Sequence, residues 1–263
     1  MTGHGFQDGR TRRFGKFGKL LRLRRAIRNW PRVLLDHTHL TKADYVCYLR
    51  NGTTFNVRGG TDDRHVIFEL FVEQIYPVHV RAGSVVIDIG AHIGCFTVWA
   101  ASQGARVFAY EPFPPNFTAL QRNLTRNRLN DVYLSNLAVA GNQQTRELFI
   151  PKNKMDSGRY SLYPGRGFET IDVESVTLDE VLSANRLDHV DLLKIDCQGA
   201  EYEILYEANP QTLARISSIV VECEYFEGEE KRSVGGIAKY LEDGGFVISS
   251  KGNLIHARRP PKL

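Results

Sequence analysis

The sequence lacks features that mark several whole classes of protein. Its apolar runs all fall short of the roughly 20 residues that span a bilayer, and the N-terminus has no apolar stretch followed by small residues, as a secretory signal would have. The four cysteines, Cys47, Cys95, Cys197 and Cys223, show no Cys-x-x-Cys spacing. We therefore expect reduced, buried thiols in a cytoplasmic protein, without a structural zinc site or disulfides.

Acidic residues are scarce at the start of the chain. Residues 1–32 contain ten Lys or Arg and one acid, Asp8, whereas the whole chain carries a formal net charge of +4. The rest of the chain is thus net acidic, which argues against a nucleic-acid partner outside this arm. Apolar residues from Phe14 to Trp30 could share one helical face. The arm is then either an interfacial helix in peripheral contact with anionic lipid or a basic helix that packs on the protein, and both hypotheses stay open.

Strand-like and helical runs alternate from residue 83 onwards, and the last two strands form a hairpin. This pattern predicts an α/β fold, a doubly wound sheet with a terminal antiparallel hairpin. An earlier β-hairpin turns at Asn51-Gly52, and Asp63 could cap the helix that follows it. The expected segments are a basic arm at 1–40, a hairpin and helix extension at 41–82, the main domain at 83–257 with a lid at 152–167, and a basic tail at 258–263.

A buried strand and a glycine turn form the most informative motif. Four apolar residues and Asp88 precede Gly90, and Gly94 ends the turn before a helix. Such a turn lets a ligand approach the backbone closely. The dinucleotide fingerprint needs a middle glycine that is missing here, which argues against an NAD-dependent oxidoreductase. The spacing resembles the first motif of Rossmann-type S-adenosylmethionine-dependent methyltransferases, with a purely structural strand-turn-helix as the alternative.

Acidic residues follow the later strands. Glu111 ends the next strand, where it could accept the hydroxyls of a ribose or favour the following helix N-terminus. Asp196 ends a third apolar strand and could act as a base, whereas Glu201 could be catalytic or a helix N-terminal charge. With Glu222 and Glu224, these acids could also hold a hard cation, although we predict no metal.

In their order, these motifs resemble those of the FkbM family of methyltransferases over residues 45–250. The family's Asp-x-Gly-Ala-Asn-x-Gly resembles residues 88–94, its Glu-Pro matches Glu111-Pro112, and its Lys-Ile-Asp-x-Glu-Gly-x-Glu resembles residues 194–201. The family's Arg-x-Gly-Thr-Ser-Asp resembles residues 58–63. The resemblance implies a Rossmann-like methyltransferase fold. It also implies methyl transfer from S-adenosylmethionine, usually to a hydroxyl of a sugar, glycan or natural product.

The resemblance also implies two sets of site residues. The expected cofactor-binding residues are Asp63, Asp88, Gly90, Ala91, His92, Gly94, Glu111, Pro112 and Ala138, with Ala138 beside the adenine. The expected catalytic residues are Asp196, Glu201 and His92, with Asp196 as the base.

Two positions depart from the family pattern. His92 stands where the family has Asn, and Gln198 stands where it has Glu. Glutamine keeps the shape of glutamate but cannot take a proton or carry a charge. The alternative to an active enzyme is therefore a catalytically silent protein that keeps the cofactor fold. The expected acceptor is a small molecule or a glycan.

Overall fold

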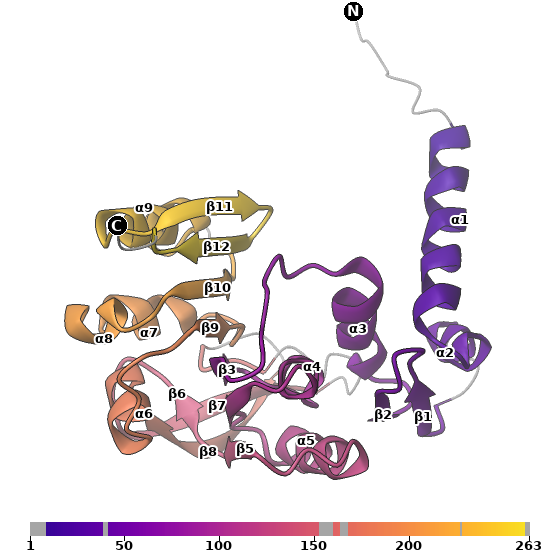
Figure 1. Ribbon diagram of the computed structural model, residues 1–263, viewed down its shortest axis with the longest axis horizontal. Coiled ribbons are helices and arrows are strands. Elements are labelled where there is room, and N and C mark those ends of the chain that lie inside the picture. Colours follow the sequence, from indigo (N-terminus) through magenta and orange to yellow (C-terminus); the bar gives the residue numbers. More distant parts are fainter. Residues whose placement is uncertain (1–8, 39–41, 153–159, 164–167, 227, 261–263) are drawn as a thin grey trace, which may run out of the picture. The chain divides into compact units, whose positions relative to one another are not determined.

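The computed structural model describes residues 9–38, 42–152, 160–163, 168–226 and 228–260. The chain forms two compact units, Met1–Ile75 and Tyr76–Leu263. The described elements of the first unit (Figure 1) are α1 (Gly9–Ala26), α2 (Trp30–His37), β1 (Tyr45–Tyr48), β2 (Thr54–Val57), α3 (Asp63–Phe68) and a π-helical turn, η1 (Glu69–Glu73).

The predicted hairpin is confirmed, because β1 and β2 pair antiparallel around the turn that contains Gly52. The prediction of one helical face from Phe14 to Trp30 is wrong. The helix ends at Ala26, Ile27 forms a β-bridge with Leu49, and Trp30 begins a new helix.

Hairpin contacts account for this break. The side chain of Asn29 donates to Val46 O at 2.7 Å and accepts from Tyr48 N at 2.9 Å. These bonds take residues 27–29 out of the helix and attach them to the hairpin. As a result Ile27 is fully buried, while Leu21 is 38% exposed. The side chains of Phe14 and Phe17 lie outside the described residues.

Asp63 does not cap α3. The N-cap residue is Asp62, which makes no side-chain cap bond, and Asp63 is the first residue of the helix. The fully buried carboxylate of Asp63 instead accepts from Arg58, at 2.9 Å from Nε and 2.7 Å from Nη2. The guanidinium thus binds both oxygens through one edge, a geometry that suits a planar fork and a carboxylate.

The second unit is built on a seven-stranded sheet in the order β11-β12-β10-β9-β3-β4-β5. Its strands are β3 (Val85–Ile89), β4 (Arg106–Tyr110), β5 (Val132–Ser135), β9 (Leu192–Ile195), β10 (Ser218–Glu222), β11 (Val247–Lys251) and β12 (Leu254–Arg258). The strands from β10 to β5 run parallel, and β12 lies antiparallel between β10 and β11. The predicted doubly wound sheet with a terminal hairpin is confirmed.

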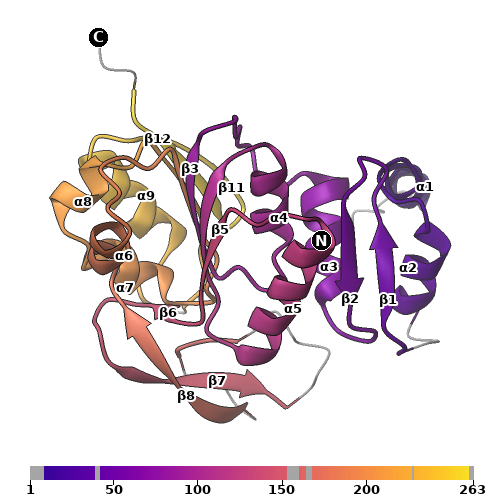
Figure 2. The same ribbon diagram turned by 60° about the horizontal axis from the view of Figure 1, so that its bottom comes forward.

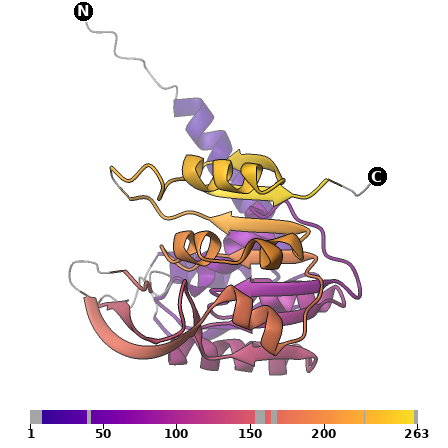
Figure 3. The ribbon, with the colours of Figure 1, turned by 90° about the vertical axis from the view of Figure 1, so that its left-hand side faces the viewer.

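Helices cover both faces of this sheet. They are α4 (Cys95–Ser102), α5 (Pro114–Arg126), α6 (Leu178–Ala184), α7 (Glu201–Tyr206), α8 (Pro210–Ala214) and α9 (Val234–Asp243). Figure 3 shows α6, α7 and α8 in front of the sheet, with α5 behind it. Because both faces are covered, all four residues of β9 and four of the five in β3 are buried, as expected for parallel strands rich in apolar residues.

The chain direction places the candidate site. From β3 the chain winds outward to β4 and β5, and it later returns to form β9 on the other side of β3. In open α/β sheets, ligands bind outside the carboxyl ends of the strands at such a switch point. The loops after β3, β4 and β9 therefore meet at one edge.

A second, three-stranded sheet follows β5. It consists of β6 (Ala138–Val139), β7 (Thr145–Pro151) and β8 (Phe168–Val176), in the order β6-β8-β7. Figure 2 shows β7 and β8 as a ribbon outside the main sheet. Of the predicted lid at 152–167, only Lys152 and residues 160–163 belong to the described residues. Ser161 pairs with Phe149 of β7 through two backbone hydrogen bonds of 2.8 and 3.2 Å.

Candidate active site

The glycine turn is attached to the end of β4. The amides of Gly90 and Ala91 both donate to Tyr110 O at 3.0 Å. Gly90 has a φ of 76°, and a Cβ there would lie 1.9 Å from Asp196 O. A side chain therefore cannot fit at position 90, because the loops after β3 and β9 touch through their backbones.

His92 occupies the left-handed region of the backbone, with a φ of 53°. Among residues other than glycine, asparagine, aspartate and histidine adopt this conformation most readily. This explains how His92 can replace the family's Asn without changing the turn. Its amide donates to Glu111 Oε2 at 2.8 Å.

Glu111 joins two loops at this edge. Its other oxygen, Oε1, accepts from Phe113 N at 3.0 Å, and the side chain of Asn136 donates to Glu111 O at 2.7 Å and to Pro112 O at 3.0 Å. Glu111 is only 5% exposed. Burial raises its pKa to about 7, against the partial opposing effect of the bonds from Phe113 and His92. Its carboxyl group thus titrates near neutral pH.

Lys194 is the centre of the charged cluster beneath the turn. Its Nζ lies 3.2 Å from Asp88 Oδ1 and 3.5 Å from Asp196 Oδ2, and it donates to Gly90 O at 3.0 Å. The residue is 4% exposed. Burial alone would lower its pKa, but the carboxylates of Asp88 and Asp196 raise the pKa above its usual value. The lysine therefore stays charged and ties the ends of β3 and β9 together.

Asp88 lies below the surface of the site. It is fully buried, and Oδ2 accepts from Thr97 Oγ1 at 2.6 Å while Oδ1 faces Lys194. Although we expected Asp88 to bind the cofactor, its carboxylate has no exposed surface here. It positions Lys194 and the first turn of α4.

Asp196 is the accessible carboxylate of the cluster, with a side chain that is 25% exposed. Besides Lys194, its partners are Tyr76 OH, 3.3 Å from Oδ2, and Gln198 Nε2, 3.4 Å from Oδ1. Both contacts are long for hydrogen bonds, so each oxygen can still accept a hydrogen bond from a ligand.

Gln198 has a φ of 56°, and the following Gly199 has a φ of 117°. The carbonyl of Gln198 accepts a hydrogen bond from Ser161 Oγ at 2.5 Å. The described part of the predicted lid thus contacts the loop that carries Asp196. A further contact joins Tyr160 to this edge, since its ring stacks on Phe113 with centroids 4.1 Å apart.

Glu201 is fully buried, although we expected it to be catalytic. Its Oε2 accepts from Gly199 N at 2.7 Å, and its Oε1 accepts from Glu224 N at 2.6 Å. Burial raises its pKa. The carboxyl group therefore joins the loop after β9 to the chain after β10, and it exposes no surface to an acceptor.

The remaining predicted residues divide between the two units. Ala138 is buried in β6, where it pairs with Ser175, and Gly94 precedes α4 with a φ of 86°. Asp63 belongs to the Met1–Ile75 unit, where Arg58 binds its carboxylate.

Sequence reasoning assigned no role to Lys194, Thr97, Asn136 or Tyr76. An acidic partner for Lys194 could have been predicted from the sequence, because a lysine inside an apolar strand needs one. The other three are ordinary polar residues in the sequence, and only the folded chain brings them to the site.

Three further features concern metal ligands, cysteines and membrane-spanning helices. The described residues contain no group of three or more His, Cys, Asp or Glu side chains that could hold a metal ion. All four cysteines are free. None of the described helices is long and apolar enough to cross a membrane.

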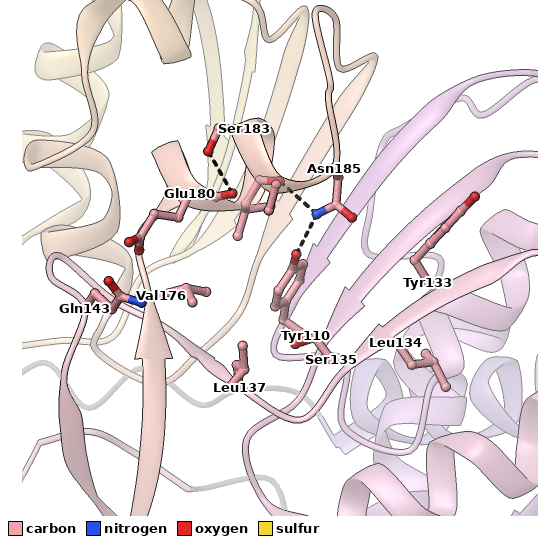
Figure 4. A pocket seen from close by; sticks show the side chains of 12 residues that line it. Tyr110, Tyr133, Leu134, Ser135, Leu137, Gln143, Val176, Glu180, Ser183 and Asn185 are labelled. Atoms are coloured by element: carbon pink, nitrogen blue, oxygen red, sulfur yellow. Dashed lines mark hydrogen bonds between the residues drawn. The ribbon is translucent and has the colours of Figure 1, made fainter.

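A cavity of about 530 Å³ lies beside this edge, between β5, α6 and the second sheet (Figure 4). Tyr110 contributes its ring, and its hydroxyl accepts a hydrogen bond from Asn185 Nδ2 at 3.0 Å. The cavity lining does not include His92, Glu111 or Asp196. It is therefore separate from the acidic edge, although the carbonyl of Tyr110 holds the glycine turn.

The edge combines a doubly wound switch point, a glycine turn and an acid at the end of the second strand, as nucleoside-binding α/β proteins do. Residues 88–248, more than half of the chain, match the family model described as the methyltransferase FkbM domain. The chain belongs to the FkbM family of methyltransferases. This agrees with the motifs in the sequence.

Individual relatives are distant. The chain is 26% identical over 243 residues to the 31-O-demethyl-FK506 methyltransferase FkbM of Streptomyces tacrolimicus, covering 80% of this chain and 91% of that protein. It is 28% identical over 213 residues to the methyltransferase sdnD of Sordaria araneosa, covering 69% and 81%. Among solved structures, the precorrin-6y C5,15-methyltransferase of Geobacter metallireducens GS-15 aligns with a TM-score of 0.42 and 16% identity, covering 69% of this chain and 82% of that one.

Proposed function

We propose that this protein transfers a methyl group from S-adenosylmethionine to a hydroxyl of a sugar, glycan or natural product. The observation that carries the proposal is the bond from His92 N to Glu111 Oε2, which fixes a carboxylate above the glycine turn. An acid at that position suits the hydroxyls of a ribose. The name of the relative from Streptomyces tacrolimicus, an O-demethyl-FK506 methyltransferase, supports a hydroxyl acceptor.

The residues present fit the nucleoside part of S-adenosylmethionine. A carboxylate offers about four acceptor sites, and the backbone amides of His92 and Phe113 take one on each oxygen of Glu111. The side chain of Asn116 donates a further hydrogen bond to Glu111. One acceptor site therefore remains for a ribose hydroxyl. The adenine would lie beside Ala138, at the start of β6, and the loop after β4. Asn136 stabilises this loop by its hydrogen bond to Pro112 O.

The sulfonium of S-adenosylmethionine supplies an activated methyl group, so the protein mainly has to orient the acceptor oxygen. In this proposal Asp196 accepts the proton of the acceptor hydroxyl, and the partial exposure of its carboxylate supports that role. Lys194 holds that carboxylate in place from below, with its Nζ 3.5 Å from Asp196 Oδ2. Asp88 and Glu201 position the two loops from buried sites.

A catalytically silent binding protein is the second candidate. It is favoured by Gln198, which cannot act as a base and contacts Asp196 through its amide. The two candidates differ in turnover but not in cofactor binding.

Calorimetry and mass spectrometry together separate them. We expect saturable binding of S-adenosylmethionine and no binding of NAD. We also expect S-adenosylhomocysteine to form when a pool of glycans and hydroxylated metabolites is added with a heavy-isotope methyl donor, with the label found on an acceptor oxygen. Binding without turnover across the pool would favour the silent protein, and failure to bind S-adenosylmethionine would contradict both.

A further inference from the structure

Arg232 lies in a cluster of aromatic rings next to the loop that carries Asp196. Its Cζ lies 3.5 Å from the ring centroid of Phe226, 4.1 Å from that of Tyr163 and 5.7 Å from that of Tyr202. The rings of Tyr163 and Phe226 also reach Gly199, since a Cβ there would lie 3.0 and 3.1 Å from them. The cluster is therefore in van der Waals contact with the loop of residues 196–199.

One edge of the Arg232 guanidinium has no hydrogen-bond partner among the described residues. The Nε and Nη2 atoms of Arg232 are buried and make no hydrogen bond within the part of the chain that the structure describes. Among the described residues, the acid that approaches this guanidinium is Glu229, 3.5 Å from Nη1. Buried polar groups are nearly always hydrogen-bonded, because an unpaired donor loses its hydration without compensation. Two such donors on one side chain are a departure from that rule.

The same protein shows what this edge of an arginine binds. Arg58 uses its Nε and Nη2 atoms to bind both carboxylate oxygens of Asp63, at 2.9 and 2.7 Å. These two N–H groups point in parallel and match the spacing of two oxygens on a carboxylate or phosphate. Arg259 provides the contrast, because it stacks on Phe246 while all three of its nitrogens donate to backbone carbonyls.

The aromatic rings around Arg232 favour strong hydrogen bonds from its guanidinium to an anion. They hold the guanidinium by cation–π contacts, and its Nε and Nη2 atoms are shielded from water. A charge-assisted bond is stronger in such surroundings than in water. Tyr163 belongs to residues 160–163, whose Ser161 bonds to Gln198 O. An acceptor held by Arg232 would thus lie between this segment and the loop of Asp196.

We propose that Arg232 is a specificity-determining residue that binds an oxyanion, a carboxylate or a phosphate, on the acceptor molecule. The Nε and Nη2 edge grips this group bidentately while the acceptor hydroxyl is presented to Asp196. The inference rests on the proposed methyl transfer and narrows its substrate class to hydroxylated molecules that also carry an anionic group, such as sugar acids and sugar phosphates.

Binding is measured first, on the full chain with S-adenosylhomocysteine present. Glucuronate, glucose 6-phosphate and glucose are titrated at constant ionic strength and followed by NMR of arginine Nε–H signals. The variants are Arg232→Gln and, as a matched control, Arg106→Gln. Arg106 also stacks on aromatic rings, Phe108 and Tyr133, but it begins β4 at the opposite end of the strand from Glu111.

We expect both anionic sugars to bind wild type and the control saturably, and glucose to bind far more weakly. In folded Arg232→Gln the affinity for the anionic sugars should fall roughly 10- to 100-fold, as for loss of hydrogen bonds to a charged group. Arg232→Lys keeps the charge without the fork and should recover only part of this loss. Equal affinities for glucose and its anionic relatives, or unchanged affinity in Arg232→Gln, would overturn the proposal.

Turnover separates this inference from the function on which it rests. If wild type methylates hydroxyl acceptors, the ratio of kcat/KM for anionic over neutral acceptors should fall in Arg232→Gln, mainly through KM. An equal loss for both acceptor types would mean that Arg232 is structural, which contradicts the inference alone. Anion binding that depends on Arg232 in a protein without any methyl transfer would contradict the proposed function alone.

Discussion

Lys194 Nζ lies 3.2 Å from Asp88 Oδ1, and this contact joins the two strands that meet at the switch point of the sheet. Asp88 belongs to β3, whereas Lys194 belongs to β9, more than a hundred positions later in the chain. The pair brings the glycine turn and the Asp196 loop together from beneath. We infer that the geometry of the site depends on this buried ion pair between β3 and β9.

Removing the lysine should be costly. In Lys194→Met the carboxylate of Asp88 stays fully buried without its cation, so the free energy of unfolding should fall by about 3–5 kcal/mol. The double variant Lys194→Met with Asp88→Asn should regain part of this loss. Urea unfolding measures both, and Lys239→Met is the control, because its pair with Asp243 is exposed and contributes at most about 1 kcal/mol. A single variant as stable as that control would contradict the inference.

A second prediction concerns glycine at position 90. Gly90→Ala combines a φ of 76° with a Cβ only 1.9 Å from Asp196 O, whereas Gly83→Ala has a φ of 84° and open space. The Gly83 variant should lose about 1–2 kcal/mol of unfolding free energy from backbone strain. Gly90→Ala should lose at least about 1 kcal/mol more, because the two loops must separate. If urea unfolding shows equal losses of unfolding free energy for the two variants, the close approach of Gly90 to Asp196 O does not affect stability.

The third prediction is a pH dependence of cofactor binding. The pKa of Glu111 is raised by burial to about 7. If Glu111 accepts from a ribose hydroxyl, as we propose, its ionised form binds the cofactor better. Affinity for S-adenosylmethionine should then fall by about tenfold between pH 8 and pH 6. S-adenosylmethionine has titratable groups of its own, so the pH profile of wild type is compared with that of Glu111→Gln. This variant should bind more weakly, and its affinity should lack the pH dependence caused by Glu111. Identical pH profiles in calorimetry would remove Glu111 from the site.

The raised pKa of Glu111 also makes the stability of the ligand-free protein depend on pH. Glu111 binds its proton more tightly in the folded state than in the unfolded chain, whose pKa is near 4.5. The free energy of unfolding should therefore fall as the pH rises from about 4.5 through about 7. Glu111→Gln should lack this contribution in denaturant titrations.

Much of this fold could be predicted from the sequence, since apolar runs and turn residues act locally. The β3 strand follows from its apolar residues on either side of Asp88, and the first hairpin follows from Asn51-Gly52. The helix boundary at Ala26 could not be predicted, because Asn29 bonds to a hairpin strand that follows later in the chain.

The candidate site also has some features that could be predicted from the sequence and others that could not. The sequence placed Glu111 and Asp196 at strand ends, where the structure has them. It could not tell that Asp88 and Glu201 are fully buried while the side chain of Asp196 is partly exposed, because burial depends on which loops cover each carboxylate. The pairing of Lys194 with two acids likewise arises only when the strands align.

A fourth prediction concerns the basic arm. Arg22, Arg24 and Arg25 are exposed on α1. If this helix contacts anionic membranes, changing all three to Gln should weaken sedimentation with anionic vesicles at low salt by roughly 100-fold, at about 1 kcal/mol per charge. The charge-matched control changes Arg122, Arg128 and Arg215, which are also exposed. Equal sedimentation of the two triple variants would contradict lipid binding by the arm.

The most direct test of the account is turnover by Asp196→Asn. The central claim is that Asp196 receives the hydroxyl proton while the methyl group passes to the acceptor. Asn preserves the shape of the side chain, so affinity for S-adenosylmethionine should stay within a few-fold of wild type. Formation of S-adenosylhomocysteine with a methylated acceptor should fall by about 10²- to 10⁴-fold. Asp188→Asn, an exposed residue before β9, should behave as wild type. Turnover of Asp196→Asn within a few-fold of wild type would contradict the claim and leave Asp196 a structural residue.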